Sequence, residues 1–272
     1  KAFSRDTLVQ VFSMTKPVTG VALMQLWEKG AFGLDDPLHW YLPEYQATRV
    51  LTGEREDGSA IVAQPKRAIT VRDVLRHTAG FSYGPGGEPQ NAADRTWQKL
   101  AQGPLLYEPG THWSYSAGVD VQARLIEVLS GQPFDSYVKQ HIFDPLGMTD
   151  TGFQVRPDQR ARLAALYSAH DGGIVLEERP DEEASFVRPV TLFSGGGGLV
   201  STAGDYLRFA EAVRRKGELD GARILGRRTV ELMTMNHLPG NVDLTAMGQP
   251  TFSETSMDGI GFGLGFSVVL DP

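Results

Sequence analysis

The sequence predicts a mixed α/β protein in which a mostly helical domain packs on an α/β domain. Two stretches support this prediction. As a helix, residues 14–29 would carry apolar side chains around most of the circumference, which is typical of a helix buried in the middle of a protein. Near the other end, Phe262, Leu264, Phe266 and Val268 alternate with glycine and serine, which predicts a strand with one apolar face. Signals for shorter helices dominate the chain between these stretches.

Composition excludes several classes of protein. The chain has 272 residues, 41 % of them hydrophobic, which is ample for a sizeable core. Its net charge is −7 and it has no basic run long enough for a nucleic-acid patch. It contains no cysteine and no apolar run that could span a bilayer. Because no signal sequence is visible, we expect a cytoplasmic protein, although a chain that begins at Lys1 could have lost a leader.

Local signals place the remaining elements in order. Residues 52–67 are largely polar, which predicts a surface excursion. Thr70 and Asp73 are spaced as a capping box that opens a short helix ending near His77. Asp171-Gly172-Gly173 is typical of a hairpin turn between short strands. Periodicity, caps and breakers predict further helices at 91–101, 119–130, 133–142, 157–167, 202–216 and 228–236.

Ser13 and Lys16 stand three residues apart at the start of the apolar helix, so their side chains share a face. Pro17 is tolerated only near a helix start, which places Ser13 where free N–H groups and the helix dipole favour negative charge. Burial would leave Lys16 a neutral amine that can act as a base. These are the parts of a covalent acyl-transfer site. An N-cap serine beside a solvated lysine is the alternative that the motif alone leaves equally open.

Two other serines occur in comparable patterns. Ser136 and Lys139 repeat the spacing inside a predicted helix, where backbone N–H groups are used internally, so we expect an ordinary structural pair. Ser82 matches the Gly-x-Ser-x-Gly elbow of α/β-hydrolases, which needs a strand before the serine and a helix after it. A capped helical segment precedes Ser82 and Pro85-Gly86-Gly87 follows it, so we expect a loop residue.

No pattern in the chain points to a cofactor or a metal. The six histidines show no His-x-x-x-His pair or other ligand spacing. His77, at a helix end, is expected to be a cap or a satisfied core residue rather than a base. The glycines at 195–198 lack the Lys-Ser/Thr of a phosphate-binding loop, and we expect flexible or closely approached backbone there.

An ordered set of motifs spans nearly the whole chain. It begins with Ser13-Met14-Thr15-Lys16-Pro17-Val18-Thr19 and continues with Leu34-Asp35-Asp36-Pro37, Leu75-Arg76-His77-Thr78-Ala79-Gly80, Pro109-Gly110-Thr111-His112-Trp113-Ser114-Tyr115-Ser116 and Gly196-Gly197-Gly198-Leu199-Val200-Ser201-Thr202. Together the motifs resemble the class C β-lactamase-like group of penicillin-recognising serine hydrolases, which includes family VIII carboxylesterases. The resemblance implies a β-lactamase/transpeptidase-like fold.

The resemblance also implies roles for three residues. Ser13 would be the acylated nucleophile, Lys16 its proton acceptor, and Tyr115 the phenol that relays protons to or from the leaving group. Without the resemblance, we would expect Tyr115 to be an aromatic side chain packed in a loop. Class C lactamases have an asparagine two residues after this tyrosine, where this chain has Ala117. Without that amide to bind the acylamino group of a lactam, simple esters are favoured.

The chain departs from the family pattern at both ends. No Lys/His-Thr/Ser-Gly or Trp-Gly-Gly motif occurs on a strand before Pro272, and only residues 1–12 precede Ser13. We therefore expect the given chain to lack N- and C-terminal strands of the family's core sheet. The expected α/β domain comprises 1–30 and 196–272, the helical domain with Tyr115 comprises 31–195, and the site lies between them.

These observations predict a serine carboxylesterase that cleaves small-molecule esters, with short acyl chains, through an acyl-enzyme on Ser13. A β-lactamase or D-alanyl-D-alanine carboxypeptidase would share the mechanism and take a lactam or peptide instead. A catalytically inactive binding protein of the same fold is the alternative of a different class. No nucleic-acid partner, membrane segment, metal or cofactor is expected, and the sequence leaves the oligomeric state open.

Overall fold

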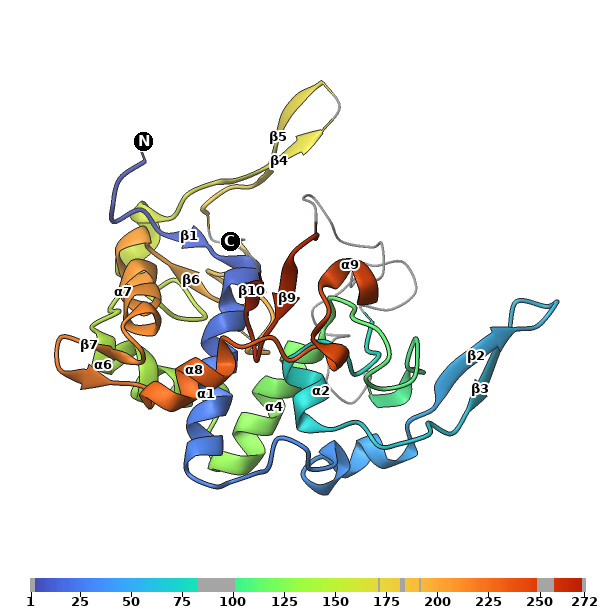
Figure 1. Ribbon diagram of the computed structural model, residues 1–272. Coiled ribbons are helices and arrows are strands. Elements are labelled where there is room, and N and C mark those ends of the chain that lie inside the picture. The colour runs from blue at the N-terminus through green and yellow to red at the C-terminus, as the bar shows by residue number, and fades with distance from the viewer. Residues whose placement is uncertain are drawn as a thin grey trace.

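Helix α1 (Thr15–Glu28) runs through the middle of the molecule, and α4 (Gly118–Ser130) packs along it (Figure 1). The computed structural model describes residues 3–82, 101–170, 172–181, 184–190, 192–248 and 257–270. Helices and antiparallel strand pairs alternate along these residues. The predicted mixed α/β class is therefore confirmed.

Every residue of α1 from Val18 to Leu26 is buried, as the all-round apolar sequence predicts. Gly30, in the left-handed conformation at φ +74°, follows the end of the helix. On one side of α1 the backbone of another segment comes unusually close. A Cβ placed on Gly20 would lie 3.4 Å from the Cα of Gly265. The C-terminal segment thus packs directly against the central helix.

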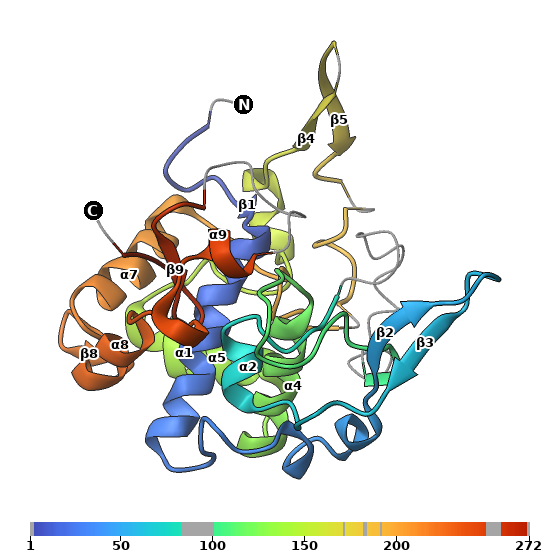
Figure 2. The ribbon, with the colours of Figure 1, turned by 45° about the vertical axis from the view of Figure 1, so that its right-hand side comes forward.

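The strands of the described residues form five two-stranded antiparallel sheets. The pairing of β1 (Val9–Gln10) with β6 (Val200–Ser201) brings the segment before Ser13 beside the segment after the glycine run. Two hairpins, β2–β3 and β4–β5, extend away from the body of the molecule (Figures 1 and 2). The remaining strands are β2 (Val50–Glu54), β3 (Ala60–Ala63), β4 (Leu166–His170), β5 (Gly173–Glu178), β7 (Glu218–Leu219), β8 (Ala222–Arg223), β9 (Ile260–Phe262) and β10 (Ser267–Val269).

Most predicted helices form where their caps place them. Thr70 and Asp73 make the predicted capping box at the start of α2, and Thr202 caps α7 by accepting a bond from the Asp205 N–H. The other helices are α2 (Val71–Leu75), α5 (Phe134–Val138), α6 (Asp144–Leu146), α7 (Ala203–Arg214), α8 (Arg227–Met233) and α9 (Leu244–Met247), with 3₁₀ turns η1 (Phe12–Met14), η2 (Leu38–Trp40), η3 (Pro43–Ala47), η6 (Pro157–Arg162) and η7 (Pro239–Asn241). Most of the predicted helix at 91–101 lies outside the described residues.

Three predictions about element boundaries are wrong. The strand predicted over 262–268 is a hairpin, because Gly265 at φ +93° turns the chain between β9 and β10. The helix predicted over 157–167 is a 3₁₀ turn that ends at Arg162, since the following residues pair as β4 with β5. The helix predicted to end near Ile142 continues through a π-helical turn, Lys139–Phe143, into α6. Pro145 is the second residue of α6, and because it has no N–H it donates no bond to the preceding π-helical turn.

The main hydrophobic core gathers side chains of α1, α2, α4 and α5, which come from both predicted domains. A smaller cluster packs beside Tyr115 and comprises Trp113, Leu238, Leu244, Met247 and Phe262. The division into 1–30 with 196–272 and 31–195 stays a prediction. Within the residues that the structure describes, no helix combines the length and apolar character needed to cross a membrane.

Candidate active site

Ser13 and Lys16 meet at the start of the central helix. Ser13 is exposed in the 3₁₀ turn η1, and Lys16 lies in the first turn of α1 with only 7 % of its surface exposed. The Lys16 amine donates hydrogen bonds to Ser13 Oγ at 3.0 Å and to the carbonyl oxygen of Gly196 at 2.7 Å. The structure therefore brings the predicted nucleophile and base into contact, and it adds a backbone acceptor that the sequence did not reveal.

The backbone around Ser13 is held from both sides. Phe12 has a left-handed φ of +42°, uncommon for a bulky residue, so the chain turns sharply just before the serine. The Val11 N–H donates to the Leu199 carbonyl at 3.0 Å, and the Tyr206 hydroxyl donates to the Met14 carbonyl at 2.9 Å. These bonds fix the turn that exposes the serine hydroxyl.

The glycine segment reaches the Lys16 amine because several contacts fix it. Thr19 Oγ1 donates to the Gly195 carbonyl at 2.8 Å from one side. Asp120, in the first turn of α4, accepts bonds from the Gly196 N–H at 3.1 Å and from Ser194 Oγ at 2.7 Å. The Gly196 carbonyl therefore points at Lys16 from a braced loop. The expectation of closely approached backbone at 195–198 is confirmed.

Tyr115 completes the predicted group. The Lys16 amine lies 4.5 Å from the centroid of the Tyr115 ring. Burial raises the pKa of Tyr115, and its interaction with the Ser13 side chain opposes that rise. All three residues predicted from the sequence thus occupy one site.

Backbone bonds and a ring stack position the Tyr115 loop. The Trp113 N–H donates to the Met247 carbonyl at 2.8 Å, and the Ser114 N–H donates to the His77 carbonyl at 3.0 Å. The His77 ring stacks on the Tyr115 ring with 5.2 Å between centroids and 21° between planes. Burial lowers the pKa of His77 to about 3, and Lys16, in its protonated form, acts in the same direction. The imidazole is therefore neutral.

A buried carboxylate supports the His77 turn from the other side. Asp73 accepts bonds from Arg67 at 2.5 Å and from Arg76 at 2.9 Å. Burial acts to raise the pKa of Asp73, but the Arg67 bond and both arginine charges outweigh it and lower the pKa to about 2. The Asp73 carbonyl also accepts the Thr78 N–H at 2.9 Å. This ionic network anchors the segment that carries His77.

A family model described as Beta-lactamase matches residues 1–270. The chain belongs to this family. Protein Rv1367c of Mycobacterium tuberculosis is 34 % identical over 283 residues, which cover 98 % of this chain and 68 % of the relative. Esterase EstB of Burkholderia gladioli is 31 % identical over 243 residues, covering 77 % of this chain and 57 % of EstB.

A solved structure agrees with the family assignment. EstCE1, described as a hydrolase with promiscuous acyltransferase activity, superposes with a TM-score of 0.76 and 28 % identity, covering 100 % of this chain and 71 % of EstCE1. These findings confirm the predicted β-lactamase-like serine hydrolase fold, and the matched relatives include a protein named as an esterase. The chain spans between about half and about 70 % of the length of these esterase and hydrolase relatives.

The two other candidate serines of this Beta-lactamase family member, Ser136 and Ser82, lie in surroundings that do not fit a nucleophile. Ser136 and Lys139 are both exposed, and the Lys139 amine pairs with Asp144 at 2.6 Å. Helix α2 and a turn precede Ser82, so the strand that a hydrolase elbow requires is absent from the described residues before it. The residues that follow Ser82 lie outside the described part of the chain. Both predictions against these serines agree with the structure.

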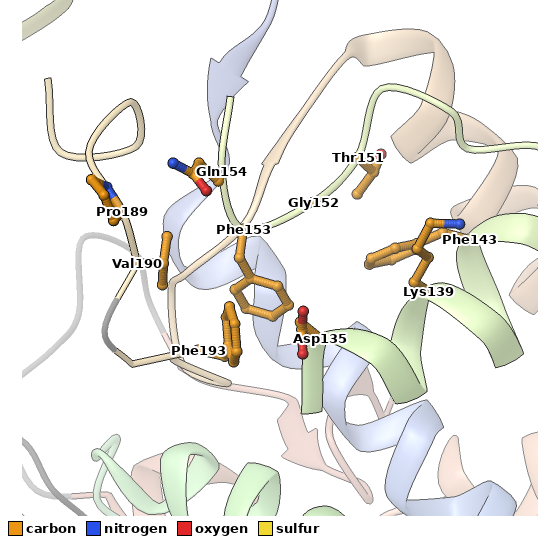
Figure 3. A pocket seen from close by; sticks show the side chains of 10 residues that line it. All are labelled: Asp135, Lys139, Phe143, Thr151, Gly152, Phe153, Gln154, Pro189, Val190 and Phe193. Atoms are coloured by element: carbon orange, nitrogen blue, oxygen red, sulfur yellow. The ribbon is translucent and has the colours of Figure 1, made fainter. Parts of the chain in front are cut away.

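A cavity of about 300 Å³ lies on another part of the molecule, next to α5 and the chain segment after α6 (Figure 3). The Phe153 and Phe193 rings meet edge to face in it, with centroids 5.3 Å apart and 63° between planes. Ser13, Lys16 and Tyr115 do not line it. The lining residues are Asp135, Lys139, Phe143, Thr151, Gly152, Phe153, Gln154, Pro189, Val190 and Phe193.

Proposed function

We propose that this protein is a serine carboxylesterase that forms a covalent acyl-enzyme on Ser13. The contact between the Lys16 amine and Ser13 Oγ, at 3.0 Å, carries the proposal. A nucleophile and its base must lie within hydrogen-bond reach, and a third group should orient the base. The Gly196 carbonyl, 2.7 Å from the amine, serves as that third group.

Acylation begins when Lys16, as a neutral amine, takes the proton of Ser13 Oγ. The oxygen forms a bond to the carbonyl carbon of the ester, and the carbonyl oxygen becomes negatively charged. The backbone N–H of Ser13, at the positive end of α1, stabilises that charge. The bond between the carbon and the alcohol oxygen then breaks. The alcohol leaves with the proton returned from Lys16 through the Tyr115 phenol.

Deacylation reverses these roles. Water attacks the acyl carbon and its proton passes through the Tyr115 phenol to Lys16. The bond from carbon to Ser13 Oγ then breaks, Lys16 returns the proton to Oγ, and the carboxylic acid leaves. An alcohol in place of water would give a new ester by the same steps. The description of EstCE1 as a hydrolase with acyltransferase activity supports testing alcohols as acceptors.

Ala117 favours esters over β-lactams as substrates. It is buried and occupies the N-cap position of α4, two residues after Tyr115. A methyl group there cannot hydrogen-bond the acylamino side chain of a lactam, and an unpaired polar group in a site costs binding energy.

The test compares p-nitrophenyl butyrate with nitrocefin as substrates of the intact protein, with intact-mass measurement of the acylated form. We expect ester turnover and acylation that Ser13→Ala abolishes, while Ser136→Ala, the matched serine in the second motif, leaves both unchanged. Turnover that survives Ser13→Ala contradicts the proposal. Preference for nitrocefin would indicate a lactamase, and absence of both turnover and acylation would indicate a binding protein.

A further inference from the structure

His77 is a buried titratable side chain beside the site that the proposed mechanism does not use. It is 4 % exposed and follows α2 with a left-handed φ of +60°. Histidine adopts this conformation more readily than most residues. Its carbonyl accepts the Ser114 N–H. The His77 backbone is therefore tied both to the end of α2 and to the Tyr115 loop.

Aromatic rings surround the imidazole. It stacks almost parallel on Tyr115, and it meets the edges of two other rings, Phe262 at 5.4 Å and 83° and Trp113 at 5.9 Å and 64°. Its Nδ1 lies 3.4 Å from Ser116 Oγ. The stacked ring limits how far the Tyr115 side chain can swing about its Cα–Cβ bond, and that bond sets where the hydroxyl oxygen lies.

The protonation state of His77 allows an effect on rate through positioning to be distinguished from an effect through proton transfer. The titratable groups of the site beside the ring are Tyr115, which stacks on it, and Lys16, next to Tyr115, and burial keeps the imidazole neutral at the pH of an esterase assay. A group that does not titrate in this range contributes no limb to a pH–rate profile.

We propose that His77 is a positioning residue, whose ring holds the Tyr115 side chain where its hydroxyl can reach Ser13 beside the Lys16 amine. This role rests on the proposed function. His77 acts only through Tyr115, and it touches neither the nucleophile nor the ester.

The chain offers suitable variants. His77→Asn suits the left-handed backbone, because asparagine adopts it readily, and it removes the stacked ring. Ser116→Ala removes the partner of Nδ1, so it loosens the stacked ring without removing it. His141→Asn is a matched control, since His141 contacts the Tyr137 ring at 4.4 Å. Its carbonyl bonds the Gln25 side chain, about three turns along α1 from the nucleophile.

The experiment is a double-mutant cycle on p-nitrophenyl butyrate hydrolysis by the intact protein. We expect His77→Asn to lower kcat about 10- to 100-fold with KM nearly unchanged, because a misplaced catalytic group loses rate. In the Tyr115→Phe background the same substitution should change kcat by less than about twofold. His141→Asn should leave kcat unchanged.

The results of this experiment show whether the positioning role of His77 or the proposed function itself is wrong. Multiplicative losses from His77→Asn and Tyr115→Phe, or a shifted acid limb in the pH–rate profile of His77→Asn, overturn the positioning role alone. Ester turnover that survives Ser13→Ala, or no turnover at all, overturns the proposed function and this role with it. If His77→Asn does not fold, Ser116→Ala takes its place, with a smaller loss of kcat that must also vanish in the Tyr115→Phe background.

Discussion

Replacing Gly195 by alanine should displace the carbonyl that orients the Lys16 amine. A Cβ at Gly195 would lie 2.7 Å from the Val119 carbonyl oxygen and 2.8 Å from Ala123 Cβ, both on α4. Neither atom can rotate away, so the glycine segment itself must move by several tenths of an ångström. The carbonyl that bonds Lys16 belongs to the next residue, Gly196, and must move with it.

The expected losses follow from this shift. Overpacking of this kind costs about 1–3 kcal/mol of stability, which lowers Tm by about 2–10 °C in a domain of this size. An ångström of misplacement costs about 100-fold in rate, so a shift of a fraction of that should lower kcat about 10-fold. KM should change little, because Gly196 contacts the base and not the ester.

Gly197→Ala is the matched control for this prediction. The atoms nearest to a Cβ at Gly197 are 3.7 Å away, an ordinary contact, so that variant should keep its Tm and kcat. The assay is p-nitrophenyl butyrate hydrolysis together with thermal unfolding of both variants. Equal kcat values for Gly195→Ala and Gly197→Ala would refute the role assigned to the Gly196 carbonyl, even if Tm differs.

Three further predictions concern single side chains. Lys16→Ala should lower the acylation rate about 10²–10⁴-fold, as loss of a general base does, while Lys139→Ala should not, which rapid-quench mass measurement checks. Because the folded-state pKa of His77 lies near 3 against an ordinary 6.5, the unfolded chain binds more protons below pH 6.5, so stability falls as pH falls. His77→Asn should therefore remove about 2 kcal/mol of the loss in unfolding free energy between pH 7 and 5, and equal slopes in urea titrations would contradict this. Asp120→Ala leaves the Gly196 N–H without its acceptor and should cost about 1–3 kcal/mol, whereas Asp120→Asn keeps an oxygen there and should cost less in the same titration.

Local chemistry made part of the site predictable. The three-residue spacing of Ser13 and Lys16 and the position of Pro17 near the helix start depend only on neighbours in the chain. Tyr115 could be found only through the family resemblance, because nothing near it in the sequence shows that its ring meets Lys16. His77 was expected to be a cap or a core residue, and its stack on Tyr115 depends on two loops that meet only in the folded chain.

In the fold, too, the elements that could be predicted depend on residues within one segment, and the others depend on contacts between distant segments. Helices α1, α4 and α7 were predictable because their apolar faces, caps and terminal glycines lie within each segment. The stretch 262–268 has the alternation of a strand, but its glycines fold it into a hairpin against α1. The braced segment at Gly196 had one signal, the run of four glycines. Asp120, which accepts the Gly196 N–H, had none beyond its place in the first turn of α4.

Peptide mapping of the trapped acyl-enzyme tests the central claim most directly. The intact protein is quenched in acid during turnover of p-nitrophenyl butyrate, digested, and the acylated residue is located by tandem mass spectrometry. We expect a butyryl group on Ser13, and none when Lys16→Ala is treated in the same way. A butyryl group on Ser82, Ser136 or any other residue would contradict it.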